Sequence, residues 1–433
     1  MDYLLLQLQN PNTQWVLAGT LLLGIASGVL GSFILLRKQS LIGDAMSHAA
    51  LPGVCLAFII TGQKSLFFFL IGAAVAALAG TYCIQAITRH SKVKEDAAIG
   101  IVLSIFFGIG IVLLTFIQQR GTGNQSGLNS FLFGQAASLV REDIVIIGLI
   151  SAILLFITGL FFKEFKLITF DFAFAKGIGL PVSFLNGLLL ILIICAVVIG
   201  LQTVGVILMS AMLITPAIAA RYWTNRLQTM VILSGVIGGL SGMLGTLLST
   251  TAKGMATGPL IIVAATSFFI VSLLFAPKKG LFARALHQIK LRNQTAMEQA
   301  LLSLYDLTEE AKSSKEQLPL FTEEFIKSRR KIGSFLLKSS LKRLEKKNWI
   351  HYGADSSWRL TTTGVAKGYE LALRYRLFEI YLMHEMEFQN ANLKNDSFDY
   401  ETLSEDMKAR LFNLLKLHKL QPTLSPKKSL KGG

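Results

Sequence analysis

The stretch GSFILLRKQSLIGDAMSHAALPGVCLAF, residues 31–58, ends one apolar run, passes through the basic pair Arg37 and Lys38, and begins a second apolar run. Further apolar runs, separated by short polar breaks, continue to about residue 276. Because a membrane-spanning helix needs roughly 20 predominantly apolar residues, several of these runs are long enough to cross a bilayer. The sequence therefore predicts an all-α polytopic membrane protein over residues 1–277, followed by a charged region typical of a soluble domain.

The number of predicted spans is nine, with eight as the alternative. Three of the runs are short, so any of them could be re-entrant or broken. No basic segment precedes the first run and more runs follow at once, which predicts a span there and not a signal peptide. The runs are 15–36, the short 45–61, 65–87, 97–116, 143–161, the short 184–201 and 204–220, 228–250 and 257–276.

The distribution of charge predicts the orientation. The chain carries 42 Lys and Arg against 26 Asp and Glu, a net charge of +16, and cytoplasmic loops of membrane proteins are enriched in Lys and Arg. If the C-terminal region is cytoplasmic, only Lys64, Arg120, Arg141 and Lys253 among the loop cations fall outside, which predicts an external N-terminus. The loop cations then inside are Arg37, Lys38, Arg89, Lys92, Lys94, Lys163, Lys166, Lys176, Arg221, Arg226, Lys278 and Lys279.

Asp44 and His48 are the ionisable residues that need an explanation, because they lie within or at the start of an apolar run. Four residues apart on a helix, they share one face. Ionisable groups in membrane segments usually face a cavity or a pathway, and a carboxylate beside an imidazole suits a divalent first-row metal ion. Pro52 and Gly53 could unwind the helix beside them. Spacing alone leaves three alternatives open: metal binding, an N-cap at Asp44 with a hydrogen-bonded interior histidine, or a proton relay.

Two loop segments are irregular. Residues 118–143 are polar and Gly-rich at first, and are predicted to be external. Residues 163–182 are too polar to span but carry the aromatic anchors Phe170, Phe172 and Phe174, which predicts a short interfacial helix facing the cytosol. The alternative is a passive amphipathic connector lying on the headgroups.

Four motifs in this order resemble the membrane permeases of manganese, zinc and iron ABC importers (ABC-3 type): residues 31–58, EDAAIGIVLS (95–104), FDFAFAKGIGLPV (170–182) and QTVGVILMSAMLITPAIAAR (202–221). The resemblance implies a bacterial inner-membrane permease, without a permanent cofactor, that dimerises with itself or a related permease. It also implies an extracytoplasmic metal-binding protein and a separate cytoplasmic ATPase as partners. The sequence itself contains no G-x-x-x-x-G-K-[ST] loop, so ATP hydrolysis is expected on that other subunit.

The same resemblance assigns roles to individual residues. It implies that Asp44 and His48, as metal ligands, line the path of the transported ion, which is Mn²⁺, Zn²⁺ or Fe²⁺ in this class. It implies that 170–182 is the coupling helix that docks on the ATPase. The coupling residues are Phe170, Asp171, Phe174, Gly177 and Pro181.

Beyond residue 277 the sequence predicts a linker helix at 278–294, a winged helix-turn-helix α+β domain at 295–415, and a basic flexible tail at 416–433. The domain prediction rests on two helical segments, a basic amphipathic helix and a short hairpin, in the order typical of winged helices. Lys338, Lys342 and Arg343 on the basic helix could contact the phosphates of DNA. The alternative is a solvated basic face or one beside the anionic inner leaflet.

The stretch WRLTTTGVAKGYELALRYRLFEIYL (358–382) resembles metal-responsive regulators of the diphtheria-toxin-repressor class. That resemblance favours Mn²⁺ or Fe²⁺ over Zn²⁺ as the cargo. The expected ligands are incomplete, since Tyr375 stands where the class has a histidine, although Glu379 is retained. His384 could substitute, but one histidine with scattered carboxylates makes a poor site. Metal sensing through the usual ligands is therefore not expected.

The sequence leads to one main prediction and two competing classes. The main prediction is the permease of an ATP-driven importer of manganese or iron, with a cytoplasmic domain of DNA-binding type. One competitor is a membrane-tethered or released transcription regulator whose spans anchor or sense. The other is a proton-coupled secondary transporter in which Asp44 and His48 relay protons.

Overall fold

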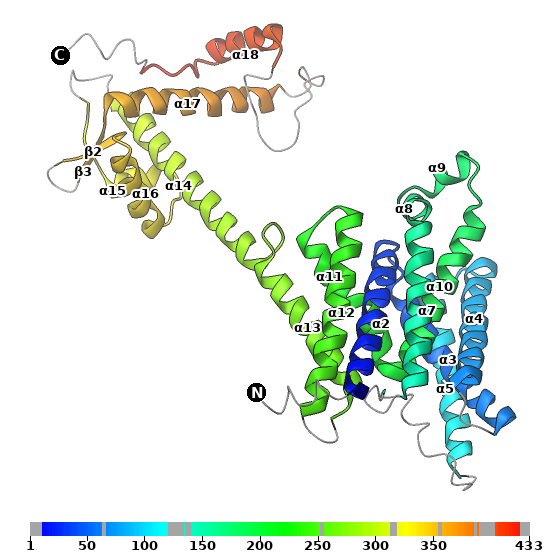
Figure 1. Ribbon diagram of the computed structural model, residues 1–433. Helices are drawn as coiled ribbons and strands as arrows, with labels where there is room; N and C mark the ends of the chain where they lie inside the picture. The colour runs from blue at the N-terminus through cyan, green and yellow to red at the C-terminus, as the bar shows by residue number, and fades with distance from the viewer. Residues whose placement is uncertain are drawn as a thin grey trace. The chain divides into compact units, whose positions relative to one another are not determined.

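The computed structural model describes residues 11–62, 66–119, 134, 140–251, 255–311, 318–353, 357–384, 388 and 403–424 (Figure 1). The chain divides into two compact units, Met1–Arg284 and Ala285–Gly433. Most of the predicted external segment 118–143, the tip of the predicted hairpin, and the tail from 425 onward lie outside the described residues.

The first unit is a bundle of long helices. Eight helices among the described residues are long and apolar enough to cross a membrane, which agrees with the lower of the two predicted counts. The run predicted at 204–220 forms helix α11 (Val206–Trp223), which is not one of the eight. The eight are α2 (Pro11–Leu36), α3 (Ser40–Thr61), α4 (Leu66–His90), α5 (Glu95–Gln119), α7 (Arg141–Leu160), α10 (Val182–Thr203), α12 (Leu227–Thr251) and α13 (Thr257–Phe275).

Small residues bring the helices of this bundle close together. A Cβ atom at Gly24 of α2 would collide with the carbonyl oxygen of Gly238 in α12, and the Ser234 hydroxyl of α12 donates a hydrogen bond of 2.6 Å to the carbonyl oxygen of Gly28. Glycine and serine at crossings are typical of membrane helices, because packing and interhelical hydrogen bonds replace the hydrophobic effect there. The α2–α12 crossing is thus encoded by residue size.

The helix α3 does not unwind at Pro52 and Gly53, so that expectation is wrong. The helix is continuous from Ser40 to Thr61 with Pro52 inside it. Gly53 instead makes room for α4, since a Cβ atom there would collide with the carbonyl oxygen of Gly72. The glycine therefore serves helix packing rather than a break.

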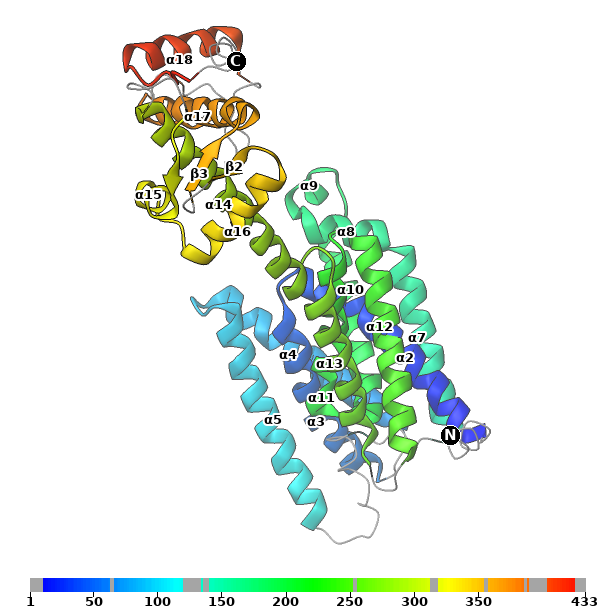
Figure 2. The same ribbon diagram turned by 90° about the vertical axis from the view of Figure 1, so that its left-hand side faces the viewer.

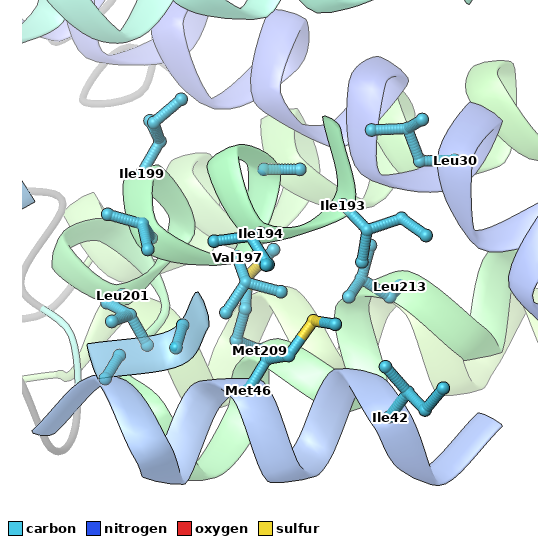
Figure 3. Packing of buried hydrophobic residues seen from close by; sticks show 14 of the residues in the cluster. Leu30, Ile42, Met46, Ile193, Ile194, Val197, Ile199, Leu201, Met209 and Leu213 are labelled. Atoms are coloured by element: carbon cyan, nitrogen blue, oxygen red, sulfur yellow. The ribbon is translucent and has the colours of Figure 1, made fainter. Parts of the chain in front are cut away.

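The second half of α10 lies in the core of the bundle. Ile193, Ile194 and Val197 are buried, as are most of their neighbours on every side of the helix. A helix that is apolar all round is a buried helix. Figure 3 shows Met46 of α3 and Met209 of α11 beside these side chains, where flexible thioethers fill the space between branched ones.

Two short helices, α8 (Phe162–Phe170) and α9 (Phe172–Gly177), connect α7 to α10. Figures 1 and 2 both show them at the end of the first unit where α2 finishes and α10 begins. The single interfacial helix predicted for this segment is therefore divided in two.

The second unit combines helices with a small sheet. The strands are antiparallel in the order β1-β3-β2, with Trp358 opposite both Phe321 and Tyr352. Helix α14 is one continuous helix that includes most of the residues of the predicted linker and the first predicted helix of the domain. The elements are α14 (Leu281–Ala311), β1 (Phe321–Thr322), α15 (Glu323–Arg329), α16 (Ser334–Lys346), β2 (Ile350–Tyr352), β3 (Ser357–Leu360), α17 (Thr362–Met383) and α18 (Glu405–Leu417).

Two apolar clusters hold the second unit together. The larger one surrounds Tyr305 of α14 and the buried face of α16, and includes Trp358 of β3. The smaller one joins α17 to α18 through Ile380, Tyr381 and Leu411, among others. The strand β1, which pairs with β3 on the side away from β2, was not predicted because it is only two residues long.

Candidate functional site

Asp44 and His48 lie on the face of α3 that is turned toward α5. The His48 ring meets the edge of Phe107 in α5, with ring centroids 4.6 Å apart. One and two turns further along, Leu51 and Cys55 share this face, and the Cys55 thiol lies 3.8 Å from the carbonyl oxygen of Gly110 in α5. The α3–α5 contact therefore positions His48, and Asp44 lies one turn before it on α3.

The two side chains are close enough to bind one ion together. The His48 Nε2 and Asp44 Oδ1 atoms are 3.6 Å apart. That separation is too long for a strong hydrogen bond, but one cation with bonds of about 2.1 Å can contact both atoms. The His48 side chain is 13% exposed and that of Asp44 33% exposed, so the carboxylate is the more accessible of the two.

The capping alternative for Asp44 is wrong. Helix α3 begins at Ser40, and its N-cap is Gln39. Asp44 is consequently a full turn inside the helix, where the backbone N–H groups already have partners within the helix. Its carboxylate is not needed to complete the helix end.

His48 is also not the hydrogen-bonded interior histidine of the second alternative. Its Nδ1 atom is buried and has no hydrogen-bond partner among the residues that the structure describes. Buried polar atoms are normally paired, and an unpaired one is costly. The neighbouring Ser47 hydroxyl is already used, since it donates to the carbonyl oxygen of Gly43 at 2.8 Å.

No further ligand joins the pair within the described part of the chain. Nowhere in those residues do three or more His, Cys, Asp or Glu side chains gather as a metal cage. One chain thus offers two potential ligands, a number that suits an ion that must be released again better than one that is held permanently.

A cavity of about 400 Å³, lined by both polar and apolar side chains, opens where α2 and α4 end and α5 begins. Gln39 donates a hydrogen bond of 3.0 Å to the Glu95 carboxylate across it, and Arg37 donates to the side-chain oxygen of Asn186 in α10. These partners are not predicted by the sequence. Asn186, a polar residue in the first turns of an otherwise apolar run, was the available signal.

The segment predicted to couple to an ATPase exposes its aromatic residues. Asp171 is the N-cap of α9, where its Oδ1 accepts a hydrogen bond of 2.9 Å from the Phe174 backbone N–H. Phe170, Phe172 and Phe174 are each more than half exposed. Gly177 ends α9, Gly179 takes a positive φ of 84°, and Pro181 precedes α10. The predicted coupling residues therefore form one compact turn with an exposed aromatic edge.

In the second unit, Lys338, Lys342 and Arg343 are all exposed on α16. The opposite face of the helix buries Leu337, Leu341 and Leu344. The helix is therefore amphipathic, as predicted, and its cations lie on the solvent side.

An ion-pair network occupies the region of Tyr375. Arg376 contacts the Glu309 carboxylate at 2.6 Å and that of Asp306 at 3.1 Å, and Arg330 reaches Asp306 at 3.2 Å. Burial alone would raise the pKa of the Glu309 carboxyl, but hydrogen bonds from Arg376 and Thr423 outweigh it and hold that pKa below its usual value. The two carboxylates are thus engaged by arginines.

Comparison with known proteins gives the family. A family model described as "ABC 3 transport family" matches residues 9–276. The chain is 62% identical to the manganese transport system membrane protein MntC of Bacillus subtilis, over 97% of this chain and 95% of that protein. It is 44% identical to the zinc transport system membrane protein TroC of Treponema pallidum, over 62% of this chain and 90% of the relative.

A solved structure resembles part of the chain. It is PsaBC from Streptococcus pneumoniae in complex with a Fab, with 37% sequence identity and a TM-score of 0.58. The match covers 64% of this chain and 96% of that one. The Treponema protein and this structure therefore match a portion about as long as the first unit, whereas the Bacillus protein also matches the second.

Proposed function

The chain belongs to the ABC 3 transport family, and we propose that it is the permease subunit of an ATP-driven importer that carries Mn²⁺ as its cargo. The relatives are named membrane proteins of transport systems, so the chain is a multi-pass transport subunit of the cell membrane and not an enzyme. Manganese is supported by the Bacillus relative, and zinc is the alternative supported by the Treponema relative. Iron stays a prediction.

The observation that carries the proposal is the pair of ligands inside the bundle. The Asp44 carboxylate and the His48 imidazole, 3.6 Å apart, bind the cation transiently as it passes through the bundle. A carboxylate oxygen suits Mn²⁺, and imidazole adds a bond that many divalent ions accept. Weak coordination by two ligands lets the ion leave when the bundle changes conformation, as alternating access requires.

The partners follow from the family and from what this sequence lacks. The sequence has no P-loop, so a separate ATPase supplies the energy, and an extracytoplasmic protein delivers the metal. A second permease chain completes the membrane part. The α9 turn, with its exposed Phe170, Phe172 and Phe174, is the surface on which the ATPase docks. A cytoplasmic position of this end is supported by Lys163, Lys166 and Lys176 through the positive-inside rule.

For the second unit we propose a cytoplasmic winged-helix domain within residues 295–415, between a linker at 278–294 and a tail at 416–433. The order of α14, α15, α16 and the small sheet supports it, and the exposed Lys338, Lys342 and Arg343 are the proposed DNA contacts. If the domain binds DNA, affinity falls steeply with salt, and substituting these three residues reduces the steepness.

The transport proposal is tested by metal accumulation in bacterial cells that lack their own importer. The cells express this chain together with its partner ATPase and metal-binding protein, which are taken from genes beside its own. The chain is either unchanged or carries His48→Ala or Asp44→Ala. His90→Ala is the control, because His90 is an exposed histidine at the end of α4. We expect manganese uptake to fall at least tenfold in both site variants and to be unchanged in the control.

Other outcomes separate the competing functions. Equal uptake in all membrane-inserted variants would show that the pair only packs the bundle. Uptake that persists without the ATPase and stops when the proton gradient is collapsed would indicate a secondary transporter. A lack of any metal uptake, together with sequence-specific DNA binding, would support the membrane-tethered regulator.

A further inference from the structure

Two histidines outside the proposed metal path meet in the second unit. His384 directly follows α17 and His418 directly follows α18, and their Nε2 atoms lie 3.3 Å apart. We propose that His384 and His418 form a second cation site, for an ion of the Zn²⁺, Ni²⁺ and Cu²⁺ class, separate from the site of the transported ion. His384 alone made a poor site in the sequence, and its partner is adjacent only in the folded chain.

The separation of the two nitrogens fits shared coordination. Zinc binds histidine nitrogens at about 2.0–2.1 Å in tetrahedral geometry, which places two such nitrogens roughly 3.3–3.4 Å apart. The two rings are inclined at 61° with their centroids 5.5 Å apart. They are therefore not stacked, and the atoms that approach each other are the distal nitrogens, which carry the metal-binding lone pair in one tautomer of imidazole.

The packing of α17 against α18 holds the pair in place. Ile380 and Tyr381 of α17 are buried together with Leu411 and Leu415 of α18. The histidines come immediately after these segments. The backbone N–H of His384 donates to the carbonyl oxygen of Ile380 at 3.1 Å, and that of His418 to the carbonyl oxygen of Leu414 at 2.9 Å. Each histidine thus extends a packed helix by one residue, so both backbones are positioned before any ion binds.

The two helix ends favour a cation, although Lys416 and Lys419 flank His418 in the sequence. Both histidines are the C-cap residues of their helices, and the C-terminal end of a helix carries partial negative charge on its unpaired carbonyl groups. Here two such ends converge on one point. The attraction is modest for each helix, but a divalent ion between the two nitrogens benefits from both.

The ligand chemistry selects the class of ion. Imidazole nitrogen suits zinc, copper and nickel, whereas Mn²⁺ binds more weakly to the same donors. No third His, Cys, Asp or Glu among the residues that the structure describes completes a cluster here. Bound by both imidazoles, the ion fastens the end of α18 to the end of α17.

The test measures Zn²⁺ binding to the full chain, purified in detergent without a polyhistidine tag. All proteins carry His48→Ala, so that the proposed transport site does not contribute. His384→Ala and His418→Ala are compared with His351→Ala, which removes an exposed histidine from β2 in the same unit. We expect each of the first two substitutions to weaken Zn²⁺ binding at least tenfold and the third to leave it unchanged. Mn²⁺ is expected to compete poorly.

A second measurement guards against variants that merely misfold. Zn²⁺ is expected to slow amide hydrogen exchange in α18 of the parent and of His351→Ala, and to have no such effect in His384→Ala or His418→Ala. The metal-free exchange of all four proteins should agree. Zn²⁺ binding by either site variant with the affinity of the control would overturn the proposal, and so would equal affinity for Mn²⁺.

Discussion

At the scale of single residues, burial decides what a side chain is for. His48 has an unpaired buried nitrogen and lies 3.6 Å from a carboxylate oxygen in a segment where ionisable groups are expensive. The surroundings also explain the glycines of α2, whose role is packing and not metal binding. Gly24 lies directly against the backbone of Gly238, so its missing side chain is what permits the helices to meet.

The glycine contact yields a prediction about stability. Gly24→Ala forces a methyl group onto the carbonyl oxygen of Gly238, and we expect destabilisation of about 1–3 kcal/mol from overpacking. Gly108→Ala in α5 is the matched control, because a Cβ atom there has open space within 4 Å, and alanine improves helix propensity. Thermal unfolding of the two detergent-solubilised variants should diverge. Equal melting temperatures would refute the role of the crossing.

At the scale of elements, the connection between α7 and α10 shows how one polar residue organises a segment. Asp171 ends α8 and caps α9, so the chain turns there and the phenylalanines around it are exposed. The spacing of apolar residues correctly predicted that this segment is helical. It did not predict the division into two helices, because a cap that occurs inside a helical pattern acts through local hydrogen bonds and not through hydrophobic spacing.

The cap yields a prediction about coupling. Asp171→Ala removes the acceptor for the Phe174 N–H and should destabilise α9 by about 0.5–2 kcal/mol. We expect a severalfold loss of metal uptake and of metal-stimulated ATP hydrolysis, with normal membrane insertion. Asp171→Asn retains a capping oxygen and should restore most of both activities. If the Asn variant fails as badly as the Ala variant, the carboxylate charge matters instead of the cap.

At the scale of the whole molecule, the chain has two units with separate cores. The buried cluster of the first unit contains only residues up to Ile261, and the clusters of the second begin at Ala296. The part of the chain that carries Asp44 and His48 therefore has an apolar core of its own.

This separation predicts the result of a truncation. A chain ending at Arg284, the last residue of the first unit, should still insert in the membrane. With its partners it should support at least half of the metal uptake of the full chain. Uptake and membrane abundance, measured together in the same cells, provide the test. Uptake that is abolished at normal abundance would assign the second unit a necessary part in transport.

The membrane class, the polar segments between the spans and the shared face of Asp44 and His48 can all be predicted from the sequence. These features depend on hydrophobic length, on the position of charges and on helical spacing, all of which are local. Basic amphipathic α16 was predicted on the same ground. The roles proposed for these residues came from family resemblance, which no spacing argument could supply.

Which helix faces which cannot be predicted in this way and is seen only in the folded chain. The contact of His48 with Phe107, the Gln39–Glu95 hydrogen bond and the meeting of His384 with His418 each join residues from different helices. The residues of each pair are far apart along the chain, so no periodic pattern in the sequence predicts that they meet. Such contacts arise because packed side chains and close glycine crossings select one arrangement of helices from the many that the same hydrophobic pattern would allow.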